Sequence, residues 1–284
     1  MIYIITQTLN GLFSAALLFL IASGLTLVFG VMRIVNIAHG SFFMLGVYVA
    51  HTIVSRTRSL LLGGLAAVVV VAAIGLVMER VFLRRFAARP LAQMTMTMGF
   101  ALLLRDLAFI IWGGDPFTLP VPAAVGGSAT LGDIVFPVYR LAVILAAATV
   151  ALMLWLVNDK TLIGARLRAT VDDAGMAAAI GINVARLSGL VFAAGAGLAA
   201  FGGLMGGPIL GGYPGMDFDL LPLAFVVVII GGMGSLKGAL VGSVIVGMID
   251  NFGKALVPEL SYFTLFAPMV IVLAIKPTGL YGRA

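Results

Sequence analysis

MIYIITQTLNGLFSAALLFLIASGLTLVFGVM, residues 1–32, contains no charged residue, and this stretch decides the fold class. As a helix rising ~1.5 Å per residue it would be ~48 Å long, whereas ~20 apolar residues already cross the ~30 Å hydrocarbon core of a bilayer. The chain therefore begins with a membrane segment longer than one crossing needs. The segment is either a long tilted helix or a helix broken near Gly24 or Gly30, and we expect the break.

The rest of the chain has the same character, because 62% of the 284 residues are hydrophobic and 10% are charged, against ~25% charged residues in a soluble domain. Further uncharged runs occupy 60–78, 141–157, 187–216, 220–236 and 260–275. We therefore predict an all-α polytopic membrane protein, formed as a single transmembrane domain over residues 1–284. It should contain about eight to ten transmembrane helices, some of them broken or short.

Lys and Arg outnumber Asp and Glu by 17 to 11. This excess does not indicate nucleic-acid binding, because the basic residues cluster in connectors between apolar runs, as the positive-inside rule requires. The rule places three regions in the cytoplasm: 80–89, 158–186 and the C-terminus from Lys276. Two regions without Lys or Arg are expected outside: 113–137 and 206–219. Arg56 and Arg58 also fall outside in this arrangement, against the rule.

Several kinds of chemistry are excluded by the residues present. With no cysteine and two histidines, the chain has little material for a metal site or a catalytic centre, and we expect neither. The single Gly-Lys pair, at Gly253, is followed by alanine, so there is no P-loop and ATP must be held by another subunit. Small residues let membrane helices touch, and on this ground we assign helix contacts to Gly195, Gly238 and Gly242.

A polar interruption at 33–41 separates two apolar segments and carries Asn36, His39 and Ser41. Two interpretations stay open: these side chains cap helix ends and satisfy freed backbone groups, or they line or gate a solute path, as buried polar groups in membranes often do. Thr97 is a further candidate for the path. A coarse echo of the interruption occurs at 225–250, where glycines and a short polar patch again divide an apolar run, a pattern typical of broken helices around a pathway.

Charges inside apolar segments are few. Arg105 and Asp106 are adjacent opposite charges within the expected span 91–112. Three roles stay open for them: their charged ends snorkel to the membrane surface, they pair with charges on other helices, or they couple transport to an ion. Asp250 and Lys254 have the i, i+4 spacing, acid first, of a helical ion pair.

The longest polar interval, 158–186, has the signals of a short helix. Asp172 or Asp173 is a natural N-cap, Gly181 suits the C′ position, and the residues between are strong helix formers. Its exposed face is expected to consist mainly of Ala174, Ala177 and Ala178, a smooth surface for another protein's groove. A short cytoplasmic helix of this kind resembles the coupling helix of ABC-transporter permeases, which their ATPase subunits grip.

The order of motifs extends this resemblance over nearly the whole chain. GLTLVFGVMRIVNIAHGSFFMLG at 24–46, TMGFALLLRD at 97–106, the GARLRA loop at 164–169, GGMGSLKGALVGSVIVG at 231–247 and KPTGLYGR at 276–283 together resemble the branched-chain amino acid ABC permease family of the LivH type. Two connectors depart from the family pattern, since Pro90 comes later than usual after the basic residues near 84 and Lys237 stands where proline is frequent.

The resemblance implies a permease subunit of an importer in the bacterial inner membrane, carrying branched-chain amino acids or related small polar or amphipathic solutes. It implies four partners in addition to the lipid bilayer: a second permease, identical or related, two cytoplasmic ATPases that hold ATP and Mg, and a periplasmic solute-binding protein. The chain itself would be non-catalytic and hold no cofactor. The main alternative from the residues is a single-chain ion-coupled secondary transporter, and a more distant one is an intramembrane enzyme.

Overall fold

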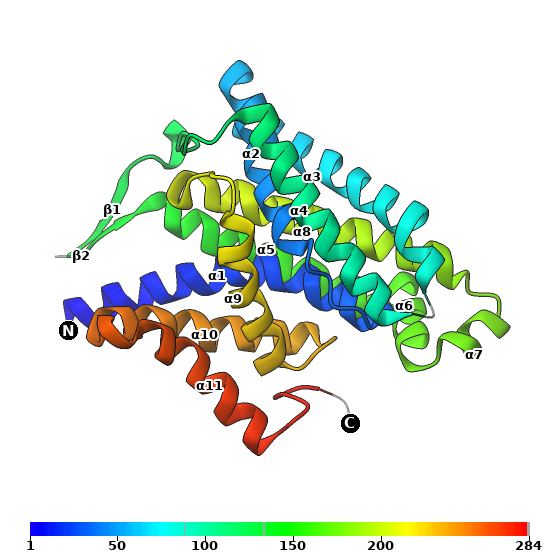
Figure 1. The fold of residues 1–284 in the computed structure, drawn as a ribbon. Helices are drawn as coiled ribbons and strands as arrows, with labels where there is room; N and C mark the ends of the chain where they lie inside the picture. The colour runs from blue at the N-terminus through cyan, green and yellow to red at the C-terminus, as the bar shows by residue number, and fades with distance from the viewer. Residues whose placement is uncertain (88, 133, 283–284) are drawn as a thin grey trace.

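The structure is a computed structural model that describes residues 1–87, 89–132 and 134–282. Asp133 and the last two residues of the chain, which belong to expected outer and cytoplasmic segments, lie outside the described residues. The described part is almost entirely helical (Figure 1). Its long helices are α1 (Ile2–Met32), α2 (His39–Thr57), α3 (Leu60–Val77), α4 (Pro90–Trp112), α5 (Val138–Lys160), α8 (Val184–Leu210), α9 (Met216–Gly231), α10 (Leu236–Leu256) and α11 (Ser261–Ile275). Short elements connect them: η1 (Met78–Phe82), η2 (Leu83–Phe86), η3 (Ala123–Val125), β1 (Ser128–Leu131), β2 (Ile134–Pro137), α6 (Leu162–Asp172), α7 (Ala174–Ala179) and η4 (Pro258–Leu260).

Six helices in the described part are long and apolar enough to cross a membrane: α1, α3 with its η extension, α4, α5, α8 and α10. The all-α membrane fold predicted from the sequence is therefore confirmed. Helices α2, α9 and α11 are shorter or less apolar, and counting them brings the described chain into the expected range of eight to ten.

Helix α1 is continuous from Ile2 to Met32, so the expected break is wrong. Its two interior glycines serve contacts instead. A Cβ added at Gly24 would lie 2.5 Å from the Gly195 carbonyl oxygen of α8, and one at Gly30 would lie 3.3 Å from the Gly234 Cα. The helix is long because it is the centre of the bundle, packed by α10 along one side and by α8, α5 and α9 elsewhere (Figure 1).

The chain between α1 and α2 runs back into the bundle rather than turning at its surface. Val35 lines a cavity together with Leu25 and Phe29, and His39, the first residue of α2, contacts Ile21. Since Ile21 lies 11 residues before the end of α1, α2 begins ~17 Å inside that end. The 19 residues of α2 are ~28 Å long, and Arg56 and Arg58 at the far end of this helix are exposed.

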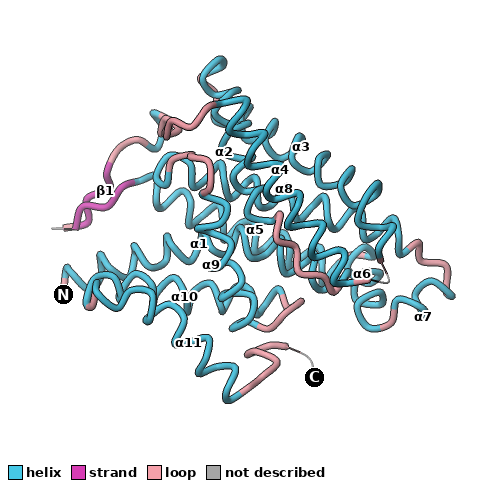
Figure 2. Tube along the Cα trace, in the orientation of Figure 1, coloured by secondary structure: helices cyan, strands magenta, loops and turns pink. Residues whose placement is uncertain are grey.

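The expected outer connectors differ from the prediction in two ways. Strands β1 and β2 pair as an antiparallel hairpin, with Ser128 opposite Pro137 and Leu131 opposite Ile134, and they are the strands drawn in Figure 2. The loop expected at 206–219 is much shorter, because α8 continues to Leu210 and α9 starts at Met216.

A second helical unit, α6 and α7, lies at the end of the molecule opposite the hairpin (Figure 1). The sequence predicted only the second of its two helices. Leu167 of α6 packs with Leu187 and Val191 of α8 and against Leu27 and Val31 of α1. The unit therefore rests on the end of α1 that leads into the re-entrant chain at 33–38.

Candidate functional site

The chain at 33–38, which we call the first linker, brings buried polar side chains into the middle of the bundle. Helix α1 ends at Arg33 in the left-handed conformation (φ 53°), and α2 begins without a side-chain cap. Asn36 is fully buried, and neither its amide oxygen nor its amide nitrogen has a hydrogen-bond partner among the described residues. Asn36 therefore does not cap α2 with its side chain.

The other three candidate path residues all make hydrogen bonds. His39 Nε2 lies 2.8 Å from the Ile21 carbonyl oxygen, which fits a histidine that satisfies the backbone of α1. Thr97 Oγ1 accepts a hydrogen bond from the Ile37 N–H at 3.1 Å and lies 2.8 Å from the Met94 carbonyl oxygen of its own helix. Thr97 thus fastens the first linker to α4.

Ser41 forms a hydrogen bond with Asp217, a residue that the sequence pattern had placed in an outer loop. Its hydroxyl donates to Asp217 Oδ2 at 2.8 Å, and Asp217 is 2% exposed in the first turn of α9. From the sequence, Asp217 belonged to an outer loop, which is wrong because α9 starts one residue before it. The missed signal was Gly215, whose left-handed conformation (φ 105°) starts the helix. Asp217 Oδ1 has no hydrogen-bond partner among the described residues.

Helix α7 is held by caps at both ends. Asp173 Oδ1 accepts from the Met176 N–H at 2.9 Å, and Asp172 is the last residue of α6. After α7, Gly181 is left-handed (φ 91°) and the Ile182 N–H bonds the Ala177 carbonyl oxygen at 3.0 Å, the closing pattern of a helix that ends in glycine.

The exposed face of α7 differs from the expected one. Ala174 and Ala178 are exposed, but Ala177 is 1% exposed, so the expectation that it belongs to the outer face is wrong. Ala177 is thus the residue through which α7 rests on the rest of the protein, while Ala174 and Ala178 remain on its exposed face.

A direct contact joins this helical unit to the first linker. The Arg33 guanidinium donates through Nη2 to the Val171 carbonyl oxygen at 3.2 Å, within two residues of the Asp173 cap. Leu27 and Val31 of α1 also pack against the apolar cluster of Leu167, Leu187 and Val191, and the two contacts together tie α6 and α7 to the end of α1.

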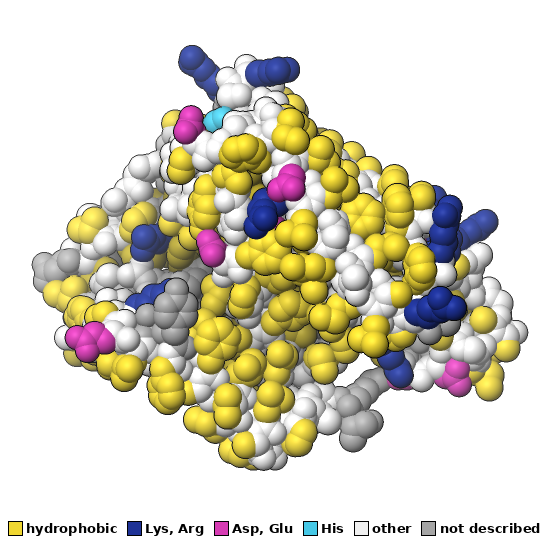
Figure 3. Space-filling view, in the orientation of Figure 1, with side chains coloured by type: hydrophobic (Ala, Val, Ile, Leu, Met, Phe, Trp, Pro, Cys, Tyr) yellow, Lys and Arg dark blue, Asp and Glu magenta, His cyan; other side chains and the backbone are white. Residues whose placement is uncertain are grey.

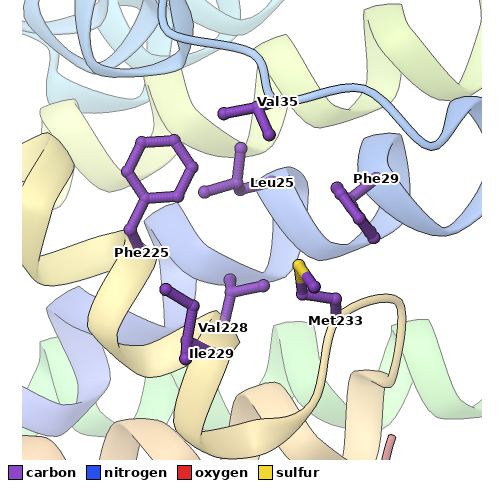
Figure 4. Close-up of a pocket in the computed structure, with 7 residues that line it drawn as sticks. All are labelled: Leu25, Phe29, Val35, Phe225, Val228, Ile229 and Met233. Carbon is purple, nitrogen blue, oxygen red and sulfur yellow. The ribbon is translucent and has the colours of Figure 1, made fainter. Parts of the chain in front are cut away.

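Two apolar cavities lie along α9 and share Phe225 and Ile229. The inner cavity lies between α1, the first linker and α9 (Figure 4), and its lining comprises Leu25, Phe29, Val35, Phe225, Val228, Ile229 and Met233. The outer groove lies between α9, α4 and α11 and has Ile37 of the first linker at one edge. The chain thus offers apolar surface to a small molecule on two sides of one helix.

The remaining candidates are structural. Gly195 packs on Gly24 and Val28 of α1, while Gly238 and Gly242 of α10 face the backbone of Gly231 and Val227 in α9. Lys254 Nζ lies 2.7 Å from Asp250 Oδ2, the expected ion pair. In the described ranges no three His, Cys, Asp or Glu side chains gather as metal ligands would.

These features define a class: a helical membrane permease, with a polar interruption inside the bundle and an amphipathic helical unit at one end. Residues 7–273 match the family described as the branched-chain amino acid transport system permease component, and the chain belongs to that family. It is 29% identical over 302 residues to the high-affinity branched-chain amino acid transport system permease protein LivH of Salmonella typhimurium, covering 99% of this chain and 96% of that one. It is 27% identical over 292 residues to BraD of Pseudomonas aeruginosa, covering 98% and 95%.

A more distant relative has another kind of solute in its name. The ribose import permease protein RbsC of Haemophilus influenzae is 28% identical over 184 residues, which cover 60% of this chain and 54% of that protein. No solved structure matches the chain.

Proposed function

We propose that the chain is a translocation subunit of an ATP-driven importer for branched-chain amino acids or related amphipathic solutes. It works beside a second permease and two cytoplasmic ATPases, and it receives solute from a binding protein outside. The single observation that carries the proposal is the physical connection from α7 through Arg33 to the buried first linker. The names of the relatives, permease proteins of branched-chain amino acid transport systems, support the solute class.

The mechanism follows from that connection. An ATPase groove closing on α7 moves α6, and α6 moves the end of α1 because the Leu167 cluster and the Arg33 contact join them. The first linker begins at Arg33, so the movement reaches Asn36 directly. A membrane bundle switches between two packings rather than deforming continuously, and access changes from one side to the other.

The cytoplasmic side of α7 and of the C-terminus is part of the proposal. The basic residues of 80–89 and 158–186 support it, together with the position of the hairpin at the opposite end of the molecule (Figure 1). Cysteines placed singly at Ser128 and Ala178, both exposed, should react with an impermeant thiol reagent from opposite sides of intact cells. The chain has no cysteine of its own, so each signal is unambiguous.

Ala178→Arg tests the function. Overpacking costs ~1–3 kcal/mol and an unpaired charge adds more, so the ATPases should be lost on purification or stop responding to loaded binding protein. Pairing with the second permease should be normal, because Ala178 is outside the bundle. Ala165→Arg is the matched control, an exposed alanine of α6 away from α7, and should transport normally. Normal uptake by Ala178→Arg with a full complement of ATPase would contradict the proposal.

One observation favours the alternative of ion coupling, because Asp217 supplies a buried carboxylate of the kind such a transporter titrates. The energy source for uptake separates an ATP-driven importer from an ion-coupled transporter. Uptake into proteoliposomes by the purified complex should require hydrolysable ATP inside and should persist when ionophores collapse the proton and sodium gradients. Uptake driven by an ion gradient alone would establish the alternative.

A further inference from the structure

Arg105 is a cation inside α4 that has no ion pair among the described residues. It lies seven residues before the end of the helix at Trp112, ~10 Å from that end, where charge is expensive and marks function. Its guanidinium carbon lies 5.3 Å from the centre of the Phe218 ring. Among the described residues no carboxylate comes within ion-pair distance of it, and Asp217 interacts with it only at longer range. Asp106, the next residue along α4, is exposed.

The outer groove begins at the same ring. Phe218 is followed along α9 by Leu221, Pro222, Phe225 and Ile229, all of which line the groove, and Met98 of α4 faces them. The groove measures about 450 Å³, within the ~300–1,000 Å³ typical of small-molecule sites. Figure 3 shows basic and acidic side chains gathered over the upper parts of α4 and α9, in the middle of an otherwise hydrophobic face.

We propose that this groove is a solute-binding site in which Arg105 binds the carboxylate of a small amphipathic acid and the apolar walls hold its aliphatic side chain. A guanidinium matches a carboxylate with two parallel hydrogen bonds, which a lysine cannot do. Phe218 lies in the first turn of α9, which already carries Asp217 and Asp219, so the attraction for an anion comes from the Arg105 guanidinium rather than from the start of the helix. The inference rests on the proposed function and deepens it by naming the site and the group recognised.

Charge complementarity selects this occupant over the obvious rival, a lipid chain. A neutral acyl chain fills an apolar groove without any need for a cation and leaves the guanidinium unpaired. An anionic lipid would pair with the guanidinium, but a site built for it would not be protected by leucine in the experiment below. A solute with one carboxylate and one branched side chain uses both features. Arg140 shows how Arg105 differs from an arginine with a hydrogen-bond partner. Arg140 also stacks on a phenylalanine, at 5.3 Å from the Phe13 ring, but its guanidinium donates to the Asn10 side chain.

The test uses Met98→Cys in the otherwise cysteine-free chain, within the purified complex in detergent, and follows the rate of alkylation by a small permeant maleimide. Leucine at about twice its dissociation constant should slow the reaction about threefold, because two thirds of the sites are then occupied. Leucinamide, which lacks the carboxylate, should not protect at the same concentration. Leu103→Cys, on an exposed part of α4 that does not line the groove, should react at one rate in all conditions.

Arg105→Gln in the Met98→Cys background should shift the protecting concentration of leucine upward by about tenfold or more, as expected for loss of a charge-assisted pair. Arg105→Lys should lie between the two, and Arg140→Gln should leave protection unchanged. Equal protection by leucinamide, or protection that survives Arg105→Gln, overturns the role of Arg105, and absence of protection overturns the site. Alkylation needs no ATP, so these outcomes are independent of Ala178→Arg.

Discussion

Two linkers interrupt long apolar runs in this chain, and they meet inside the molecule. The first linker joins α1 to α2, and the second, residues 232–235, joins α9 to α10. Gly30, near the end of α1 that leads into the first linker, packs on Gly234 of the second linker. Both linkers also line the inner cavity, the first through Val35 and the second through Met233 (Figure 4). Each also starts with a left-handed residue, Arg33 at φ 53° and Gly232 at φ 101°.

The two linkers differ in what they carry. The second is a tight turn: Ser235 caps α10 by accepting from the Gly238 N–H at 3.1 Å, and α9 and α10 then pack closely through their glycines. The first is longer, runs back along α1 and buries the unpartnered Asn36. The first linker also has an arginine, Arg33, at a left-handed backbone position that glycine would adopt with less strain. The second linker is therefore built for packing, whereas the first combines local strain at Arg33 with the contact of Arg33 to Val171.

The largest effect should come from breaking the second linker with Gly232→Val. The left-handed conformation excludes a β-branched residue, and a Cβ at this position would collide with the backbone of Gly282. Strain of ~1–3 kcal/mol from the backbone alone, with the collision added, should leave little or no assembled protein. Gly127→Val is the control, because a Cβ there meets no atom within 4 Å. Membrane levels on immunoblots measure both, and equal levels would show that the turn is not needed for packing.

Arg33→Gly separates strain from contact in the first linker. Glycine relieves the left-handed conformation, worth ~1–2 kcal/mol, but costs ~0.5–1 kcal/mol in chain entropy, so the unfolding free energy should change little. Uptake per complex should nevertheless fall several-fold while the ATPases stay bound, because the hydrogen bond to Val171 is lost.

Arg58→Gly is the matched control for that variant. Arg58 ends α2 in the same conformation, at φ 54°, but it lies at the end of the helix away from the first linker. Thermal unfolding and uptake, measured together, decide the comparison. If both variants transport normally, the contact between Arg33 and Val171 has no part in coupling.

The fold class and most helix positions could be predicted from the sequence, because long apolar runs and clustered arginines are direct consequences of the bilayer. The break expected in α1 was wrong for an identifiable reason. Gly24 and Gly30 were interpreted by their backbone freedom, whereas in lipid a glycine more often marks a close helix contact, as Gly24 does with Gly195. The same rule had been applied to Gly238 and Gly242 in the last third of the chain.

The parts of the site that sequence reasoning missed depend on tertiary contacts. Helix α6 was hidden by its charges, and its few apolar positions, such as Leu167, become meaningful only when α1 and α8 lie beside them. The burial of Asp217 depends on α2 starting deep in the bundle, which places Ser41 against α9. No local pattern encodes a re-entrant linker, because its backbone partners come from other helices.

The smallest effect on stability should come from Asn36→Leu, and this variant sharpens the comparison most. Removing an amide whose donor and acceptor are both buried without partners costs nothing in hydrogen bonding, and leucine keeps a similar volume, so the melting temperature should be unchanged or higher. Ser235→Ala in the second linker does the opposite: it removes a cap worth ~1 kcal/mol and should lower the melting temperature while uptake per complex is unaffected. If Asn36 lines the path, Asn36→Leu should reduce uptake at normal assembly and normal affinity for the binding protein. A loss of assembled complex equal to the loss of uptake would instead mean that Asn36 holds the linker in place, and the two linkers would then differ in depth but not in purpose.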